Sequence, residues 1–189
     1  MSWLVTVRHP QPAQKGICYG RADVAAEFSS KQLDALLAQL GGLWPGRGPE
    51  LVVSSPARRC HRLAVELATR LALPLDVDAR LLELAFGQWE RRSWRDLGQE
   101  PSFQAWMRNW KSAAPPDGES LAELHARVCQ WLEASVERGV PLLVVTHAGV
   151  VRSLRVRLAG WTWERAFDEA VPYLVPEPWL ADDPGSRRE

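Results

Sequence analysis

Two apolar runs of the sequence end in a histidine. Residues 5–7 read Val-Thr-Val and lead into Arg8 and His9, and residues 142–146 read Leu-Leu-Val-Val-Thr and lead into His147. Continuous apolar runs are typical of buried strands, and in a parallel sheet ligands bind beyond the carboxyl ends of the strands. A single histidine after a strand is more often an ordinary polar residue. Two of them, one beside an arginine, predict a catalytic edge.

Charged side chains occur where they could complete such an edge. Ser-Ser-Pro at residues 54–56 ends another apolar run and precedes Arg58 and Arg59, and Glu83 is a carboxylate among the apolar residues 81–86. A phosphate monoester is nearly a dianion at neutral pH, and its transfer requires positive charge around the equatorial oxygens. Arginines at this edge therefore predict a site for phosphoryl groups.

The segments that must position these residues alternate between strand and helix patterns. Strands are predicted at residues 5–8, 51–53, 75–77 and 142–146, with an edge strand at 171–175, and helices at residues 30–40, 56–71, 121–138 and 150–158. Strands alternating with helices predict an α/β fold with a mostly parallel sheet.

Four residues mark where the predicted helices begin. Ser29 and Ser120 each stand three residues before Gln or Glu, which is the spacing of a capping box. Ser55 and Pro56 have the residue types preferred at an N-cap and at the first helical position. The helix after Ser120 is predicted to bury a stripe of Leu121, Leu124, Val128, Leu132 and Val136.

The composition of two segments differs from that of the rest of the chain. Residues 89–118 contain four of the ten tryptophans and predict a small inserted cap. These tryptophans either form the core of the cap or stack on a flat ligand. Residues 177–189 are rich in proline and charge and predict a loose tail. The length of 189 residues predicts one domain, residues 1–189.

The charge and the cysteine content of the chain limit the ligands and partners that it is expected to bind. Lys+Arg and Asp+Glu both number 23, so there is no general attraction for nucleic acid or an acidic membrane. The three cysteines have no CxxC spacing, which argues against a disulfide framework and a zinc cluster. No leader or membrane-spanning run is present, so we expect a cytoplasmic protein. We expect no metal or other cofactor, and a homodimer is compatible with the sequence.

The ordered motifs Arg-His, Ser-Ser-Pro-x-Arg-Arg, an embedded glutamate and Val-Thr-His-Ala-Gly resemble those of the histidine phosphatase superfamily, also called the phosphoglycerate mutase-like family. The resemblance covers nearly the whole chain. It implies a three-layer α/β/α sandwich and a phosphomonoesterase that acts on a small-molecule phosphate ester. It also implies that His9 becomes a phosphohistidine, that Glu83 is the general acid, and that His147 donates to the phosphoryl oxygens.

The same resemblance distinguishes the two adjacent arginines. The family's phosphate-binding arginine stands three residues after the proline of Ser-Pro-x-x-Arg, which here is Arg59, and Arg58 is interpreted as a surface residue. Arg8 is the other phosphate-binding arginine that the resemblance implies. Side chains alternate along a strand, so Arg8 and His9 must be brought to one ligand by the turn that follows.

The loop after the first strand departs from the family pattern. Pro10 replaces the glycine of the usual Arg-His-Gly and has no backbone N–H. The asparagine found a few residues later in many members is also missing from residues 11–16. Gln11 and Tyr19 are the candidates to replace it. Further candidates for substrate binding in this loop are Gly20 and Arg21.

Three motifs resemble one branch of the family most closely. Cys-Tyr-Gly-Arg-Ala-Asp at 18–23, Phe-Gly-Gln-Trp-Glu at 86–90 and Pro-Asp-Gly-Glu-Ser at 116–120 are similar to motifs of the α-ribazole-5′-phosphate phosphatases of cobalamin biosynthesis. A broad-specificity phosphatase or a phosphoglycerate mutase-like enzyme is the alternative. A non-catalytic module that binds a phosphorylated ligand is an alternative of another class.

Overall fold

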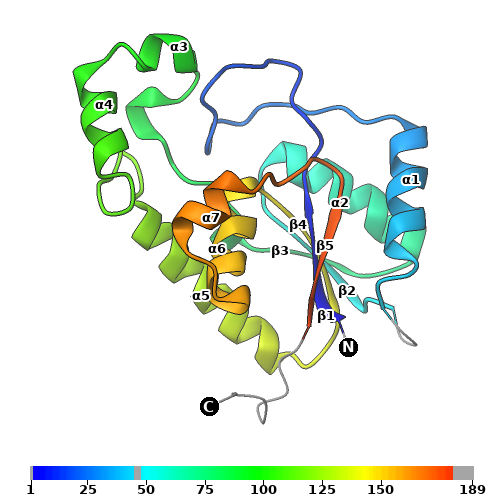
Figure 1. The fold of residues 1–189 in the computed structure, drawn as a ribbon. Coiled ribbons are helices and arrows are strands. Elements are labelled where there is room, and N and C mark those ends of the chain that lie inside the picture. Colours follow the sequence, from blue (N-terminus) through cyan, green and yellow to red (C-terminus); the bar gives the residue numbers. More distant parts are fainter. Residues whose placement is uncertain (1, 45–47, 181–189) are drawn as a thin grey trace, which may run out of the picture.

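The computed structural model describes residues 2–44 and 48–180, and its centre is a five-stranded sheet (Figure 1). The strands are β1 (Ser2–Arg8), β2 (Leu51–Ser54), β3 (Leu75–Val77), β4 (Leu142–Thr146) and β5 (Pro176–Leu180). Their order across the sheet is β3-β2-β4-β1-β5. The pairs β1–β4, β2–β4 and β2–β3 are parallel, whereas β5 runs antiparallel to β1. The predicted mostly parallel sheet is confirmed.

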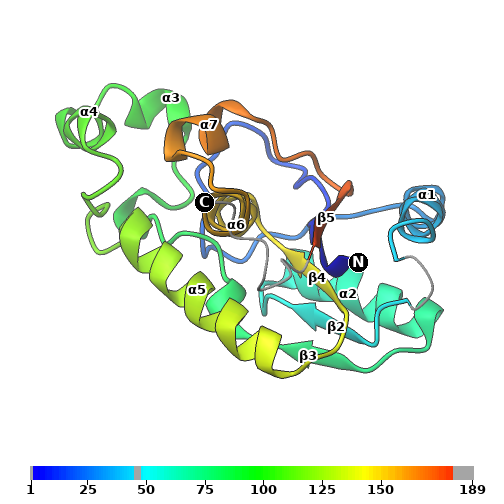
Figure 2. The ribbon, with the colours of Figure 1, turned by 60° about the horizontal axis from the view of Figure 1, so that its bottom comes forward.

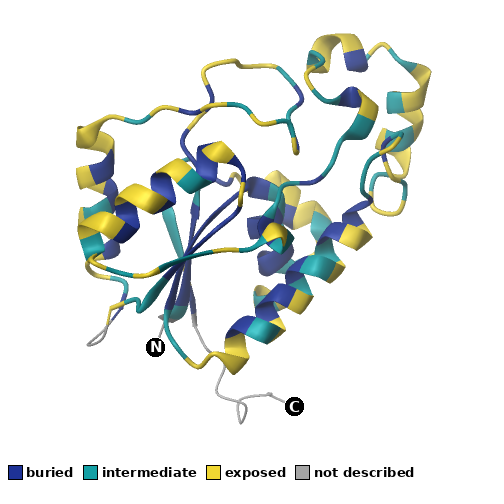
Figure 3. Ribbon diagram, turned by 180° about the vertical axis from the view of Figure 1, so that it is seen from behind, coloured by how far each residue is buried: buried dark blue, intermediate teal, exposed yellow. Residues whose placement is uncertain are grey.

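Helices cover both faces of the sheet and give the predicted three layers (Figure 2). These helices are α1 (Ser30–Leu40), α2 (Arg58–Leu71), α5 (Leu121–Glu137) and α6 (Ala148–Ala159), with α7 (Trp163–Asp168) packed against α6. Val5 and Val7 of β1 share a core cluster with α1 and α2, and Leu4 shares another with α5 and α6. Side chains that alternate along a strand thus enter opposite cores, and the central strands β1, β2 and β4 are largely buried on both faces (Figure 3).

Residues 89–118, which we call the cap segment, lie beyond the helical layers, next to the ends of the strands (Figure 1). The elements in and before this segment are the 3-10 turns η1 (Ala79–Leu81) and η2 (Gly87–Trp89) and the helices α3 (Trp94–Leu97) and α4 (Pro101–Arg108). Trp89 and Leu97 form a small core with Cys18, and Phe103 and Trp106 pack against it. Because Cys18 precedes α1, this core ties the loop after β1 to the cap segment.

The C-terminal edge strand lies later in the chain than predicted. The sequence indicates residues 171–175, but β5 is formed by Pro176–Leu180 and pairs with β1. Residues 177–180 are therefore part of the sheet, and the prediction of a loose tail from residue 177 is wrong for them. Two prolines in β5 obscured the strand pattern, and an edge strand tolerates them because one side makes no ladder bonds. Residues 181–189 lie outside the described part of the chain.

The sequence predicted the start of two helices correctly, and misplaced one other start and one buried position. Both capping boxes, at Ser29 and Ser120, are present. The start predicted at Ser55 is too early, because α2 begins at Arg58. The Ser55 hydroxyl accepts from the Ala57 N–H at 3.4 Å and is also hydrogen-bonded to a histidine. Val136 is 57% exposed and does not belong to the buried stripe of α5, whereas Ser135 is buried.

Candidate active site

The carboxyl ends of β2, β4 and β1 lie side by side, so the residues that follow these strands meet at one edge. The backbone N–H of His9 donates to the Thr146 carbonyl at 3.0 Å, and that of Ser55 donates to the Val145 carbonyl at 3.0 Å. His147 directly follows Thr146 at the end of β4. The structure thus brings both predicted histidines together, with ring centroids 5.1 Å apart.

His9 is buried, and its two ring nitrogens have different partners. Nδ1 lies 2.7 Å from the Pro10 carbonyl, which can only accept, so Nδ1 carries the proton. Nε2 consequently holds a lone pair, and it accepts a hydrogen bond from Arg59 Nε at 3.2 Å. Burial and the charge of Arg59 lower the pKa of His9 to about 3, so the ring is neutral at pH 7. Pro10 supplies this orienting carbonyl even though it lacks an N–H.

Arg59 is buried beside both histidines. Its Nη1 donates to the Ala22 carbonyl at 2.9 Å, and its Nη2 donates to the Gly20 carbonyl at 2.6 Å. Gly20 comes so close to the backbone between η1 and η2 that a Cβ there would lie 1.8 Å from the Leu84 carbonyl oxygen, so a side chain at this position is excluded. Gly20 therefore acts through its backbone. It holds Arg59 and does not line the cavity described below.

The adjacent Arg58 points away from this site. Its side chain is 76% exposed and lies near the carboxylate of Asp23. Neighbouring residues on a helix point in different directions, and here only Arg59 reaches the strand ends. Arg21, another predicted candidate, forms an ion pair with Glu119 at 3.3 Å and does not line the cavity.

His147 lies behind Arg59. Its Nδ1 is 3.2 Å from Arg59 Nη2, which donates to it, and its Nε2 is 2.8 Å from the Ser55 hydroxyl. Burial, followed by the charge of Arg59, lowers its pKa well below the ordinary value. Both nitrogens are engaged, and His147 does not line the cavity. Donation to a phosphoryl oxygen would require one nitrogen to exchange its partner, so that role stays a prediction.

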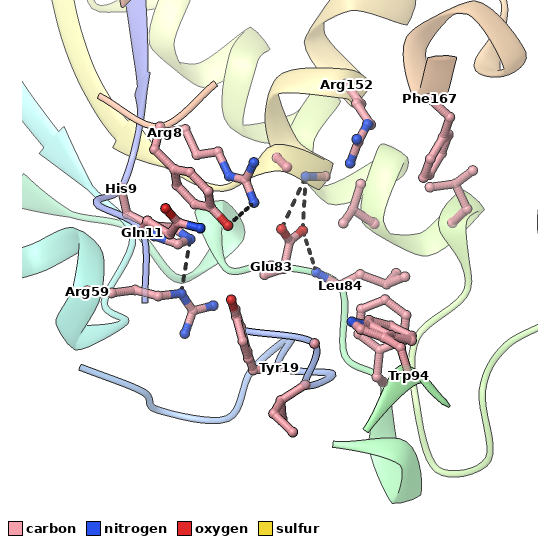
Figure 4. A pocket seen from close by; sticks show the side chains of 18 of the residues that line it. Arg8, His9, Gln11, Tyr19, Arg59, Glu83, Leu84, Trp94, Arg152 and Phe167 are labelled. Atoms are coloured by element: carbon pink, nitrogen blue, oxygen red, sulfur yellow. Dashed lines mark hydrogen bonds between the residues drawn. The ribbon is translucent and has the colours of Figure 1, made fainter. Parts of the chain in front are cut away.

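Glu83 faces the N-terminal end of α6 (Figure 4). Its carboxylate accepts from the Gly149 N–H, at 3.1 and 3.2 Å for the two oxygens, and from the Leu84 N–H at 3.0 Å. Gly149 stands in the first turn of α6, where N–H groups are free and the helix dipole favours negative charge. These donors orient a carboxylate toward the space in front of His9.

Arg8 reaches the same space through contacts that the sequence did not indicate. Its Nη1 donates to the Val171 carbonyl at 2.7 Å, and its Nη2 donates to the Tyr173 hydroxyl at 2.9 Å. The guanidinium also lies 3.7 Å from the centroid of the Tyr173 ring. The segment before β5 thus holds Arg8 toward the site.

A cavity of about 410 Å³ joins these groups to the cap segment. One end contains the predicted residues Arg8, His9, Gln11, Tyr19 and Arg59, and Glu83 lies further along (Figure 4). The other end is lined by aromatic side chains, namely Phe86, Trp94, Trp106, Trp110 and Phe167. The cavity is therefore larger than a phosphate group and offers an apolar surface to the remainder of a ligand.

Arg152 and Tyr173 also line the cavity and were missed from the sequence. Arg152 lies in α6, one turn after Gly149, and its guanidinium is 4.6 Å from the centroid of the Phe167 ring. Its place on the helix that follows His147 was a usable signal. Tyr173 is in an irregular segment after α7, and no pattern marked it.

The described residues contain no group of three His, Cys, Asp or Glu side chains that could hold a metal ion. In residues 2–44 and 48–180 no helix is long and apolar enough to cross a membrane. The groups of this chain that line the cavity and could act on a phosphate ester include the neutral imidazole of His9, the carboxylate of Glu83 and three arginines, namely Arg8, Arg59 and Arg152.

Comparison with known proteins agrees with this geometry. The chain is 33% identical over 115 residues to the adenosylcobalamin/alpha-ribazole phosphatase of Escherichia coli, which is 59% of this chain and 57% of that protein. It is 31% identical over 147 residues to the glucosyl-3-phosphoglycerate phosphatase of Mycobacterium tuberculosis, covering 67% of this chain and 66% of the relative. The match thus spans little more than half the length of the E. coli relative.

A solved structure extends the likeness to nearly the whole fold. The α-ribazole phosphatase of Shigella flexneri superposes with a TM-score of 0.75 and 26% identity, covering 92% of this chain and 87% of that one. The family model described as histidine phosphatase superfamily (branch 1) matches residues 4–174, from β1 to the segment before β5. The chain therefore belongs to the histidine phosphatase superfamily.

Proposed function

We propose that this protein is a phosphatase that transfers the phosphoryl group of a monoester to Nε2 of His9 and then to water. The observation that carries the proposal is the bond from His9 Nδ1 to the Pro10 carbonyl. It leaves the lone pair on Nε2, beside the guanidinium of Arg59. A neutral imidazole nitrogen next to fixed positive charge is suited to attack phosphorus while the charge on the oxygens is stabilised.

The remaining groups of the site act in two half-reactions. In the first, a bond forms between Nε2 and phosphorus while the ester P–O bond breaks, and Glu83 gives its proton to the departing oxygen. In the second, Glu83 takes a proton from water, whose oxygen attacks phosphorus and releases inorganic phosphate and free His9. Arg8 and Arg59 hold the equatorial oxygens through both steps. His147 either supports Arg59, as its present contacts favour, or adds a donor to these oxygens.

We further propose α-ribazole 5′-phosphate as the substrate and cobalamin biosynthesis as the pathway. Two relatives bear the name of this activity, and the aromatic end of the cavity could hold a flat base joined to the ribose phosphate. Trp89 is only 2% exposed and serves the core of the cap segment, whereas Trp94 and Trp110 face the cavity. This arrangement supports a core role for Trp89 and a ligand-stacking role for Trp94 and Trp110, the two roles that the sequence left open.

A comparison of three esters tests this substrate. Ribose 5-phosphate has the phosphate and sugar without the base, and 3-phosphoglycerate replaces both sugar and base with a small acid. We expect the highest kcat/KM for α-ribazole 5′-phosphate. Trp94→Leu should lower that value about tenfold and leave ribose 5-phosphate nearly unchanged, since a stacked aromatic pair contributes about 0.5–1.5 kcal/mol. Equal values for all three esters would support the broad-specificity alternative.

A further inference from the structure

Tyr173 holds the arginine that precedes the proposed nucleophile. Its hydroxyl accepts from Arg8 Nη2 at 2.9 Å, and its ring centroid lies 3.7 Å from the guanidinium carbon. The same ring is 5.7 Å from that of His9. One side chain therefore contacts Arg8 in two ways at the place where the phosphoryl group would sit.

The backbone on both sides of Tyr173 adds two more bonds to Arg8. The Val171 carbonyl accepts from Nη1 at 2.7 Å, and the Leu174 N–H donates to the Arg8 carbonyl at 3.0 Å. A free arginine has many rotamers, and only a few of them could face a ligand in front of His9. The segment 171–174 selects such a rotamer before any ligand arrives.

These contacts leave one hydrogen-bond donor of Arg8 without a partner. Its Nε is buried and has no hydrogen-bond partner among the described residues. A buried donor without a partner is unfavourable, and a phosphoryl oxygen could accept from it. Burial and the neighbouring Tyr173 raise the pKa of Tyr19, and both tyrosines line the cavity, so the loop after β1 comes to the same point.

We propose that Tyr173 is a positioning residue: its ring and hydroxyl aim Arg8 at the phosphoryl group that His9 receives. The inference rests on the proposed phosphohistidine function. It explains how the turn after β1 brings Arg8 and His9 to one ligand although side chains alternate along the strand. Tyr173 acts on the reaction through Arg8 and needs no contact with the reacting atoms.

Inhibition by orthovanadate, which imitates a phosphoryl group in transfer, measures this positioning. Tyr173→Phe keeps the ring and removes the hydroxyl, and Tyr173→Leu removes both. We expect Tyr173→Phe to raise the vanadate Ki roughly tenfold and Tyr173→Leu to raise it further, within the range of about 10- to 100-fold for lost bonds to charged groups. In an Arg8→Ala background, Tyr173→Leu should change Ki less than about twofold, because its partner is gone.

A structural control separates positioning from general destabilisation. Trp179→Phe removes the hydrogen bond from Trp179 Nε1 to the Thr6 hydroxyl between β5 and β1, away from Arg8. We expect this variant to lower Tm and to leave Ki within about twofold of the wild type, because the lost bond stabilises the sheet and involves no atom of Arg8.

Two results would overturn the inference while the proposed function stands. One is an unchanged Ki in Tyr173→Phe and Tyr173→Leu, and the other is an equal rise in Ki with and without Arg8. Should Tyr173→Leu fail to fold, the comparison of Tyr173→Phe in the two backgrounds decides. Wild-type protein that neither turns over a phosphate monoester nor binds vanadate would instead overturn the proposed function.

Discussion

Arg59 donates its Nε–H to His9 Nε2 across 3.2 Å, so a fixed positive charge faces the nitrogen that we propose to be phosphorylated. Two carbonyls of the loop after β1 hold the same guanidinium in place. The arrangement disfavours a proton on His9 and would favour a phosphoryl group with negative oxygens beside it.

The neutral state of His9 predicts how stability depends on pH. Its pKa is about 3 in the folded protein and about 6.5 in an unfolded chain, so the unfolded state takes up a proton first as the pH falls. Stability should therefore decrease from pH 6.5 toward pH 3, by about 1.4 kcal/mol per pH unit for this histidine. Urea unfolding at pH 7, 6 and 5 measures the slope, and His9→Gln should reduce it. A slope identical in the two proteins would contradict a buried, neutral His9.

Arg59→Ala should reduce kcat/KM far more than Arg58→Ala. Losing a charged hydrogen-bond donor to a phosphoryl group costs about 1.5–3 kcal/mol or more, which is at least about a tenfold loss. Arg58→Ala should stay within about twofold of the wild type, because its side chain is 76% exposed and faces Asp23. Parallel kinetics on one ester test the pair, and equal losses would refute the assignment.

Glu83→Gln should impair an alkyl phosphate more than a nitrophenyl phosphate. An alkoxide leaves only when protonated, so the variant should lose most of a factor of about 10² to 10⁴ in the phosphorylation rate of a ribosyl 5′-phosphate. Nitrophenolate is a stable anion and leaves with little need for protonation. Single-turnover rates are required, because in the proposed mechanism Glu83 also acts in the hydrolysis of the phosphoenzyme. Equal loss on both esters would mean that Glu83 is not the acid.

Gly149→Ala should displace the carboxyl group of Glu83 while leaving that group chemically intact. A Cβ at residue 149 would lie 2.2 Å from Glu83 Oε1, so the carboxylate must move away from the α6 N–H. We expect the variant to reproduce the ester dependence of Glu83→Gln, with a smaller loss of about tenfold or more. Gly42→Ala is the matched control, because its new methyl group meets no atom within 4 Å. Wild-type rates on the alkyl ester in Gly149→Ala would show that the placement of Glu83 is unimportant.

The sequence predicted the parts of the site that belong to regular elements. Arg8, His9 and His147 follow or end apolar strands, and Arg59 lies in the first turn of a helix with a clear buried stripe. Such positions can be inferred because strand ends of a parallel sheet meet at one edge. The resemblance to a family then separated Arg59 from Arg58.

Contacts that depend on irregular backbone could not be predicted in this way. The carbonyls that hold Arg59, the Tyr173 ring under Arg8 and the N–H of Gly149 on Glu83 join segments with no periodic pattern. The position of His147 behind Arg59 was missed for the same reason, since its ring contacts Ser55 in the irregular turn before α2. Proline in β5 concealed the last strand by removing the usual strand signal.

The most direct test of the proposed mechanism is to trap the phosphoenzyme. Brief incubation with a ³²P-labelled monoester, followed by quenching in alkali and peptide mapping, should place an acid-labile label on the peptide that contains His9. His9→Ala should remain folded and carry no label, and in the wild type the label should pass to water as inorganic phosphate, not to a second alcohol. Label transfer to an alcohol would indicate a mutase. Full turnover by folded His9→Ala, or a label on another residue, would contradict the phosphohistidine account.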